Sequence, residues 1–169
     1  FRKDLQTTVA ALLKNPAMAV EVLAPAICEG TSVVRFGTCL THGGRQCGLK
    51  SADRHWSGSS CVAWSHKGSQ GGTAHYTIVY FLCWVALRRL LQETEVVLEN
   101  VTGFPIPLLA RLLGDLYFID EDTLNMLNFG LPINRERKYL KCYHRTKALP
   151  VLVPWSRFSQ RFWRICSYT

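Results

Sequence analysis

Residues 73–101, TAHYTIVYFLCWVALRRLLQETEVVLENV, indicate the fold most clearly. Apolar side chains recur at helical spacing from Ile78 to Leu91, so we expect one long helix over residues 73–92. Residues 95–101 predict a strand, because three consecutive apolar residues suit a parallel strand that is buried on both faces. A helix that leads directly into such a strand favours an α/β sheet with crossover helices.

The segments on either side fit the same class. Residues 3–14 show helical spacing of apolar side chains, and residues 107–113 predict another helix with Gly114 as its C-terminal cap. Residues 116–119 and 138–143 predict strands. We therefore expect alternating helices and strands in one α/β fold.

Less regular sequence fills the rest of the chain. Pro25 is expected to break any helix over residues 17–27. Residues 28–72 are rich in Gly, Ser, Cys and His, which predicts loops with short strands. The residues after Ala148 give no clear assignment.

The composition favours one globular domain that binds a polyanion. The chain has 169 residues, 48% of them hydrophobic, and Lys plus Arg exceed Asp plus Glu by 20 to 12, a net charge of +8. Such an excess suits nucleic acid as a partner. The longest apolar run, residues 78–87, is too short to cross a membrane, so we expect no membrane association. Because Phe1 begins the chain and no apolar leader follows, we expect a fragment without a signal peptide.

The cysteines predict reduced thiols. Seven cysteines without a Cys-x-x-Cys pair disfavour a secreted disulfide framework and favour an intracellular protein. Cys39, His42, Cys47 and His55 include the residue types that hold zinc, but their spacing matches no common zinc pattern. We therefore expect no metal site and interpret these cysteines as half-buried thiols.

Three further segments carry groups that could do chemistry. Cys61 lies in a Gly- and Ser-rich loop before a helix, where a thiol can be exposed. Glu99 ends the buried strand, the place where open α/β sheets bind ligands. Arg135 and Arg137 share one face of an extended segment and could bind an oxygen or a phosphate. Taken singly, each of these groups is better explained by its ordinary role: an inert thiol, an ion-paired carboxylate and a solvated basic turn.

In this order, the three segments resemble the catalytic domain of the cytosine-C5 DNA methyltransferases. Cys61, Ser65 and Gly68 keep the offsets of that family's Pro-Cys-Gln loop. The remaining matches, within a resemblance that covers residues 52–145, are Glu99-Asn100-Val101, Leu124-Asn125, Phe129-Gly130-Leu131-Pro132 and Arg135-x-Arg137.

The chain also departs from the family pattern. Ser60 replaces the proline before the cysteine, Val62 replaces the glutamine after it, and Ile133 replaces the glutamine of the last motif. The family's glycine-rich cofactor loop is not visible upstream, where Phe36-Gly37 and Gly43-Gly44 are poor substitutes.

The resemblance implies an incomplete Rossmann-like sheet with flanking helices, of the kind that binds S-adenosylmethionine. Residues 1–50 would form a divergent N-terminal part, residues 51–148 the catalytic core, and residues 149–169 an unassigned segment. The implied reaction is methylation of C5 of a flipped cytosine in DNA, in the nucleus, with S-adenosylmethionine as the methyl donor.

The resemblance also implies a role for each matched residue. The Cys61 thiolate would add to C6 of the base, Glu99 would bind N3 and the amino group, and Arg137 with Arg135 would bind the O2 side. The supporting residues of the loop would be Ser65, Gly68, Asn100 and Val101.

Three alternatives stay open at this point. One is an RNA cytosine methyltransferase, because the tRNA-modifying branch shares these motifs. Another is a non-catalytic remnant that binds nucleic acid. The third is a cysteine hydrolase in which Cys61 works with a histidine.

Overall fold

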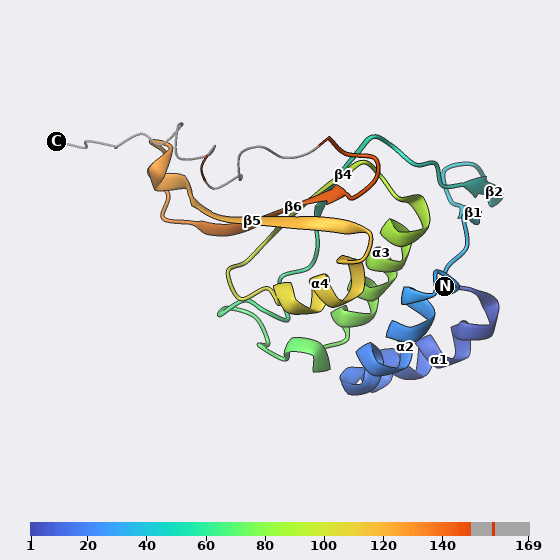
Figure 1. Cartoon of the computed structure of the whole chain (residues 1–169). Helices are drawn as coiled ribbons and strands as arrows, with labels where there is room; N and C mark the ends of the chain where they lie inside the picture. Colours follow the sequence, from blue (N-terminus) through green and yellow to red (C-terminus); the bar gives the residue numbers. More distant parts are fainter. Residues whose placement is uncertain (150–156, 158–169) are drawn as a thin grey trace.

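A four-stranded mixed sheet lies over helices in the computed structural model, which describes residues 1–149 and residue 157 (Figure 1). Nearly all of the unassigned segment 149–169 lies outside the described residues. The strand order is β3-β4-β6-β5. The strands are β3 (Arg54–Gly58), β4 (Glu95–Asn100), β5 (Tyr117–Asn125) and β6 (Glu136–His144).

Two crossover helices connect the parallel strands. Helix α3 (Thr77–Leu91) joins β3 to β4, which pair in parallel, and helix α4 (Ile106–Leu113) joins β4 to β5. Strand β6 is antiparallel to both β4 and β5, so β3, β4 and β5 all run the same way. The prediction of an α/β fold with an incomplete Rossmann-like sheet and flanking helices is confirmed. Strand β4 is buried on both faces as predicted; it pairs in parallel with β3 and antiparallel with β6.

Strand β4 is the centre of the core, as its apolar run predicted. Val96 and Leu98 are buried in the cluster that the helices share with the sheet, and Val97 is buried on the opposite face. Burial of each such side chain contributes about 1.5–3 kcal/mol. The buried part of this strand therefore fixes the position of its last two residues, Glu99 and Asn100.

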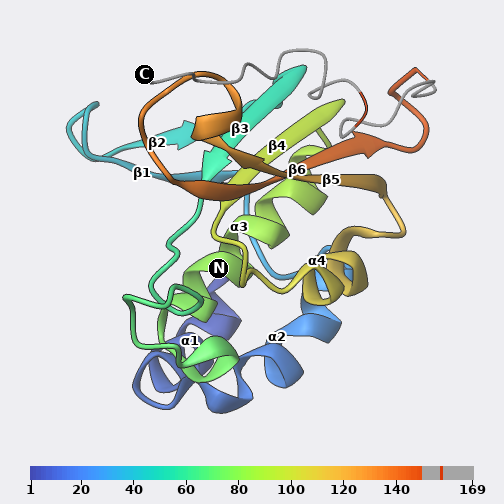
Figure 2. The same ribbon diagram turned by 90° about the vertical axis from the view of Figure 1, so that its left-hand side faces the viewer.

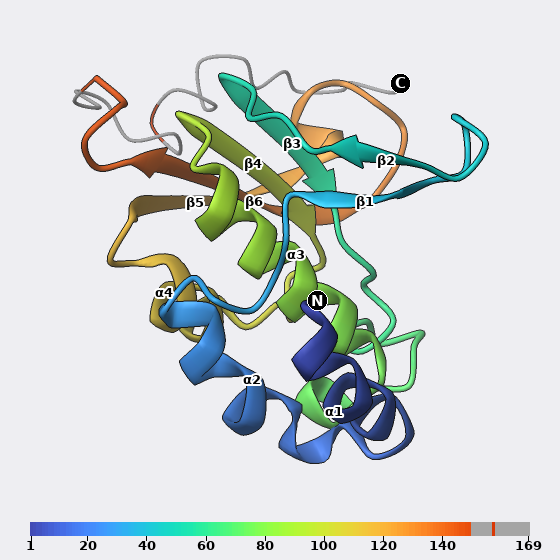
Figure 3. The same ribbon diagram turned by 90° about the vertical axis from the view of Figure 1, so that its right-hand side faces the viewer.

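The four α-helices within residues 1–149 lie on one side of the sheet. Helices α3 and α4 lie directly against it, and α1 (Lys3–Lys14) and α2 (Ala19–Cys28) form a further layer beyond them (Figures 2 and 3). The expected break at Pro25 is wrong, because Pro25 lies inside α2. Five apolar side chains of α2 are buried against the core, and that burial holds the helix together despite one lost backbone hydrogen bond.

Helix α3 begins later than predicted. Residues Gly72–Ala74 form a short 3-10 helix, and α3 starts only at Thr77, where the backbone N–H donates to His75 Nδ1 at 3.3 Å. Further 3-10 turns cover Pro16–Met18 and Met126–Asn128. Helix α4 ends at Gly114 as predicted, since a Cβ there would overlap the carbonyl oxygen of Ala110.

The loop-rich region carries short strands, as predicted. Strands β1 (Phe36–Cys39) and β2 (Arg45–Gly48) form a separate antiparallel hairpin. Strand β3 is polar because it is an edge strand, and its Trp56 side chain is 66% exposed. The six cysteines among the described residues are all free thiols. Within the described residues, no helix combines the length and the apolar character needed to span a membrane.

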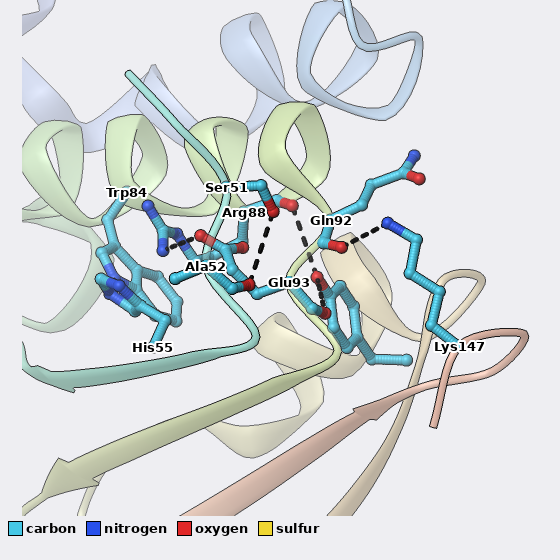
Figure 4. A network of polar contacts seen from close by, with 9 residues as sticks. Ser51, Ala52, His55, Trp84, Arg88, Gln92, Glu93 and Lys147 are labelled. Carbon is cyan, nitrogen blue, oxygen red and sulfur yellow. Dashed lines mark hydrogen bonds and ion pairs between the residues drawn. The ribbon is translucent and has the colours of Figure 1, made fainter. Parts of the chain in front are cut away.

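A buried ion pair fixes the join between α3 and β4 (Figure 4). Arg88 Nη1 donates to Glu93 Oε1 at 2.5 Å, and both side chains are almost fully buried. Burial lowers the pKa of Arg88 and raises the pKa of Glu93. The Tyr117 hydroxyl donates to the Glu93 carbonyl at 3.1 Å, and Lys147 Nζ donates to the Gln92 carbonyl. These contacts fix the position of the first residue of β4. Because the strand is continuous and largely buried, they also fix the position of its last residues, Glu99 and Asn100.

Candidate functional site

The segments that carry the predicted site residues meet at one edge of the sheet. Because β3, β4 and β5 run in the same direction, their C-terminal ends lie together, and the antiparallel strand β6 begins at that same edge. The Cys61 loop leaves β3, Glu99 and Asn100 end β4, and Arg137 lies at the start of β6. Ligands of open α/β sheets bind at this edge.

A tight turn presents Cys61. The backbone N–H groups of Trp64 and Ser65 both donate to the Cys61 carbonyl, at 3.0 and 2.8 Å. The Cys61 side chain is partly exposed. The Ser65 hydroxyl accepts from the Lys67 backbone N–H at 3.3 Å, a contact within the loop. Cys61 therefore lies on a structured turn beside the sheet edge.

Asn100 ties this loop to the sheet. Its Nδ2 donates to Ser59 Oγ at 2.8 Å and to the Ser59 carbonyl at 3.4 Å. Its Oδ1 accepts from the Val101 backbone N–H at 2.9 Å. The side chain is 2% exposed. Buried, fully used polar groups of this kind hold a loop in one position, here two residues before Cys61.

Two glycines allow the loop to pack closely. A Cβ at Gly68 would overlap the carbonyl oxygen of Val62, so only glycine fits that turn. A Cβ at Gly103 would lie 2.8 Å from the Trp64 carbonyl oxygen. The Trp64 ring in turn packs edge-to-face against Phe104, with ring centroids 6.2 Å apart. Close packing of the backbone therefore explains why residue 68 is glycine, which the position of Gly68 in the motif did not reveal.

Glu99 and Arg137 form an ion pair on the face of the sheet away from the helices. Arg137 Nε lies 3.0 Å from Glu99 Oε1, and the two side chains are 23% and 36% exposed. The register pairs Glu99 with Tyr139 on one side and with Gly58 on the other. A Cβ at Gly58 would lie 3.6 Å from Glu99 Oε2, so the missing side chain leaves space beside that oxygen.

A cavity of about 440 Å³ joins the Cys61 loop to β6. Its lining includes Cys61, Lys67, Arg135 and Arg137, and Glu99 adjoins it through the ion pair with Arg137. A larger hollow of about 820 Å³ lies beside the β1–β2 hairpin and contains none of these residues. Because the smaller of these two cavities brings the Cys61 thiol together with Arg135 and Arg137 and adjoins Glu99, we take it as the candidate site.

Sequence reasoning missed part of this lining. Trp64, Thr102 and Gly103 line the cavity, yet no periodicity or charge pattern singled them out. His66 also lines it, and its Nδ1 lies 3.3 Å from Gln70 Nε2. Within the described residues, no hydrogen bond joins Cys61 to a histidine ring, so the cysteine-hydrolase alternative gains no support.

The described residues do not fit S-adenosylmethionine in the manner that the resemblance implies. Gly37 and the pair Gly43-Gly44 lie in the separate hairpin and not between a strand of the main sheet and a helix. Strand β3 ends the sheet on the side of the Cys61 loop. Within residues 1–149, the glycine-rich connection from a sheet strand to a helix is the Cys61 loop between β3 and α3, and no such turn precedes it in the place of the family's cofactor loop.

Comparisons with known proteins gave only partial structural matches. No protein-family model and no curated protein matches the chain. A prophage-encoded E. coli protein assigned as a DNA modification methyltransferase matches 56% of this chain at 18% identity and a TM-score of 0.44. The S. pombe Dnmt2 methyltransferase matches 59% at 18% identity and a TM-score of 0.44. The Entamoeba histolytica methyltransferase EhMeth matches 54% at 17% identity and a TM-score of 0.41.

These matches involve 27%, 33% and 32% of those three proteins, so the chain spans about a third of their length or less. All three are methyltransferases by name. At such identity and TM-score, the function has to be argued from the residues of this chain.

Proposed function

We propose that this chain carries the thiol and base-binding part of a DNA cytosine-C5 methyltransferase. The observation that carries the proposal is the cavity at the sheet edge, which brings Cys61 together with Arg135 and Arg137, with Glu99 held against Arg137. Such a cavity can accept one base only after the base leaves the stack, so the proposal includes base flipping.

The thiol supplies the chemistry that C5 lacks. C5 of cytosine is a weak nucleophile, and addition of a thiolate to C6 turns C5 into an enamine-like carbon. Cys61 is suited to this step because its turn places it on the cavity wall and Asn100 holds the preceding Ser59 in place. The bond formed is Sγ–C6, and the electron pair moves through the ring to C5.

The ion pair complements the edge of a cytosine. That edge offers an amino donor, the ring nitrogen N3 and the O2 acceptor. The Glu99 carboxylate accepts from the amino group and from protonated N3, and the Arg137 guanidinium donates to O2. The two side chains already lie side by side, with Arg137 Nε 3.0 Å from Glu99 Oε1, so both groups can face the edge of one base. Binding charge at N3 and O2 favours addition at C6.

The surroundings of the cavity suit a phosphate backbone. Lys67 and Arg135 are exposed at its lining, and the chain as a whole carries a net charge of +8. Contacts of this kind position a strand without reading its sequence. They do not separate DNA from RNA, which is why both enter the test.

No step of this proposal runs through the methyl donor, because the described residues do not fit S-adenosylmethionine. Addition of Cys61 to C6 can be observed without it. In D₂O, the enamine carbon takes a deuteron at C5; loss of the original C5 proton and then of the thiolate returns cytosine labelled at C5.

The test is deuterium exchange at C5 in short single-stranded DNA and RNA oligonucleotides, read by mass spectrometry. We expect exchange in DNA with the unaltered chain and with Cys28→Ser, which removes an exposed thiol of α2. We expect none with Cys61→Ala. Exchange in RNA alone would select the RNA alternative, and binding without exchange would select the non-catalytic remnant.

A further inference from the structure

The β1–β2 hairpin gathers three soft ligand groups at its tip. His42 Nδ1 lies 3.3 Å from Cys39 Sγ and 3.1 Å from Cys47 Sγ. All three ligand atoms lie within 4.8 Å of one another. His55, the fourth residue of the sequence set, lies elsewhere, because its Nε2 accepts from Trp84 Nε1 at 3.2 Å.

The hairpin register explains how the two thiols meet. Cys39 pairs with Arg45 and Gly37 pairs with Cys47, so Cys39 and Cys47 are diagonal neighbours on one face. Gly37, opposite Cys47, has no side chain to fill the space between them. A Cβ at that position would have no atom within 4 Å.

The turn explains how the imidazole joins them. Gly43 and Gly44 have φ values of +61° and +81°, which favour glycine. The Gly44 N–H donates to the Cys39 carbonyl at 2.9 Å and closes the turn. His42 thereby returns over the same face as the two cysteines.

Hydrogen bonding alone does not account for this arrangement. A neutral imidazole nitrogen has either one N–H or one lone pair, so Nδ1 makes one good hydrogen bond. Here it lies at contact distance from two sulfur atoms at once. Two sulfur atoms and one ring nitrogen that lie this close together are instead arranged like the ligand atoms around a metal cation.

Within the described residues, the hairpin is not part of the main sheet. Its strands form a two-stranded sheet apart from the main one, and Phe36 and Leu40 are 66% and 93% exposed. Isolated two-stranded hairpins are at best marginally stable in water. A bound metal supplies folding free energy in such small units, because the site exists only in the folded state.

We propose that Cys39, His42 and Cys47 bind one Zn²⁺ and that the ion holds the β1–β2 hairpin in shape. Two thiolates and one imidazole nitrogen are ligands that zinc prefers. The fourth tetrahedral position is left to water or to another donor. This site departs from the expectation based on ligand spacing, which did not take into account the turn at Gly43-Gly44.

The test measures zinc bound to the full 169-residue chain, purified under reducing conditions, loaded with Zn²⁺ and freed of excess metal. We expect one zinc per chain by elemental mass spectrometry. Cys39→Ser and His42→Ala should each reduce the zinc content at least tenfold. Cys28→Ser is the matched control and should keep the full zinc content, because Cys28 lies in α2.

Circular dichroism shows whether each variant folds, and folding is expected because the hairpin lies outside the core. Amide hydrogen exchange over residues 36–48 gives an independent measurement. Protection there should fall when a chelator removes zinc from the unaltered chain. A chain that takes up no zinc, zinc content that survives both substitutions, or a Cys39–Cys47 disulfide that persists with excess reductant would each overturn the proposal.

Discussion

Replacement of Asn100 by alanine tests how the Cys61 loop is held. The side chain is buried and makes two short hydrogen bonds, to Ser59 Oγ at 2.8 Å and from the Val101 N–H at 2.9 Å. Each such bond is worth about 1 kcal/mol, and the groups left unpaired add to the loss. We expect Asn100→Ala to lower the free energy of unfolding by about 2–3 kcal/mol. In urea this shifts the midpoint by about 1 M.

A double-mutant cycle separates the contact from a general loss of packing. Ser59→Ala removes only the bond to Oγ, so it should cost about 1 kcal/mol alone and almost nothing in the Asn100→Ala background. Loss of the anchor should also speed alkylation of Cys61, as measured by peptide mass spectrometry. Additive costs in the cycle, or a cost for Asn100→Ala below about 0.5 kcal/mol, the usual level for surface changes, would show that Asn100 does not hold the loop through Ser59.

Three further outcomes follow from the packing and the titratable groups. Gly68→Ala should cost about 1–3 kcal/mol in thermal unfolding, because the new Cβ overlaps the Val62 carbonyl oxygen, whereas Gly37→Ala meets open space and should cost less than about 0.5 kcal/mol. Glu93→Leu alone should cost about 3–5 kcal/mol, because Arg88 is left charged and buried, and adding Arg88→Met should recover most of that loss. Burial raises the pKa of Cys142 to about 12, so this thiol contributes stability that is present below its unfolded pKa of about 8.5 and is lost as the pH rises toward 12. Cys142→Ala should therefore flatten the alkaline fall in stability, as measured by urea unfolding at a series of pH values.

The sequence predicted the parts of the fold in which side-chain pattern and burial agree. Helix α1 and strand β4 were found with their observed bounds to within a residue, because amphipathic spacing and a run of apolar residues are local signals. Pro25 misled the prediction, since burial of the α2 side chains outweighs the local preference of proline. The antiparallel placement of β6 between β4 and β5 depends on long-range pairing that no local pattern encodes.

In the candidate site, too, the motifs predicted some features, whereas others depend on long-range packing. The order of the motifs suggested that Cys61, Glu99 and Arg137 belong together, and the common direction of β3 and β4 places them at one edge of the sheet. The roles proposed for them stay predictions. The close approach of Gly103 to Trp64 depends on how separate loops pack, so no local pattern predicted it.

In the proposed function, a thiol, a carboxylate and a guanidinium act on one base, and C5 deuterium exchange with a carboxylate variant shows whether the carboxylate takes part. Glu99→Gln should abolish exchange in the DNA oligonucleotide, because the amide cannot stabilise a protonated N3 as the carboxylate does. Glu121→Gln, which changes an exposed carboxylate of β5, should leave exchange unchanged. Equal exchange by the two variants would show that Glu99 takes no part in the addition of Cys61 to the base.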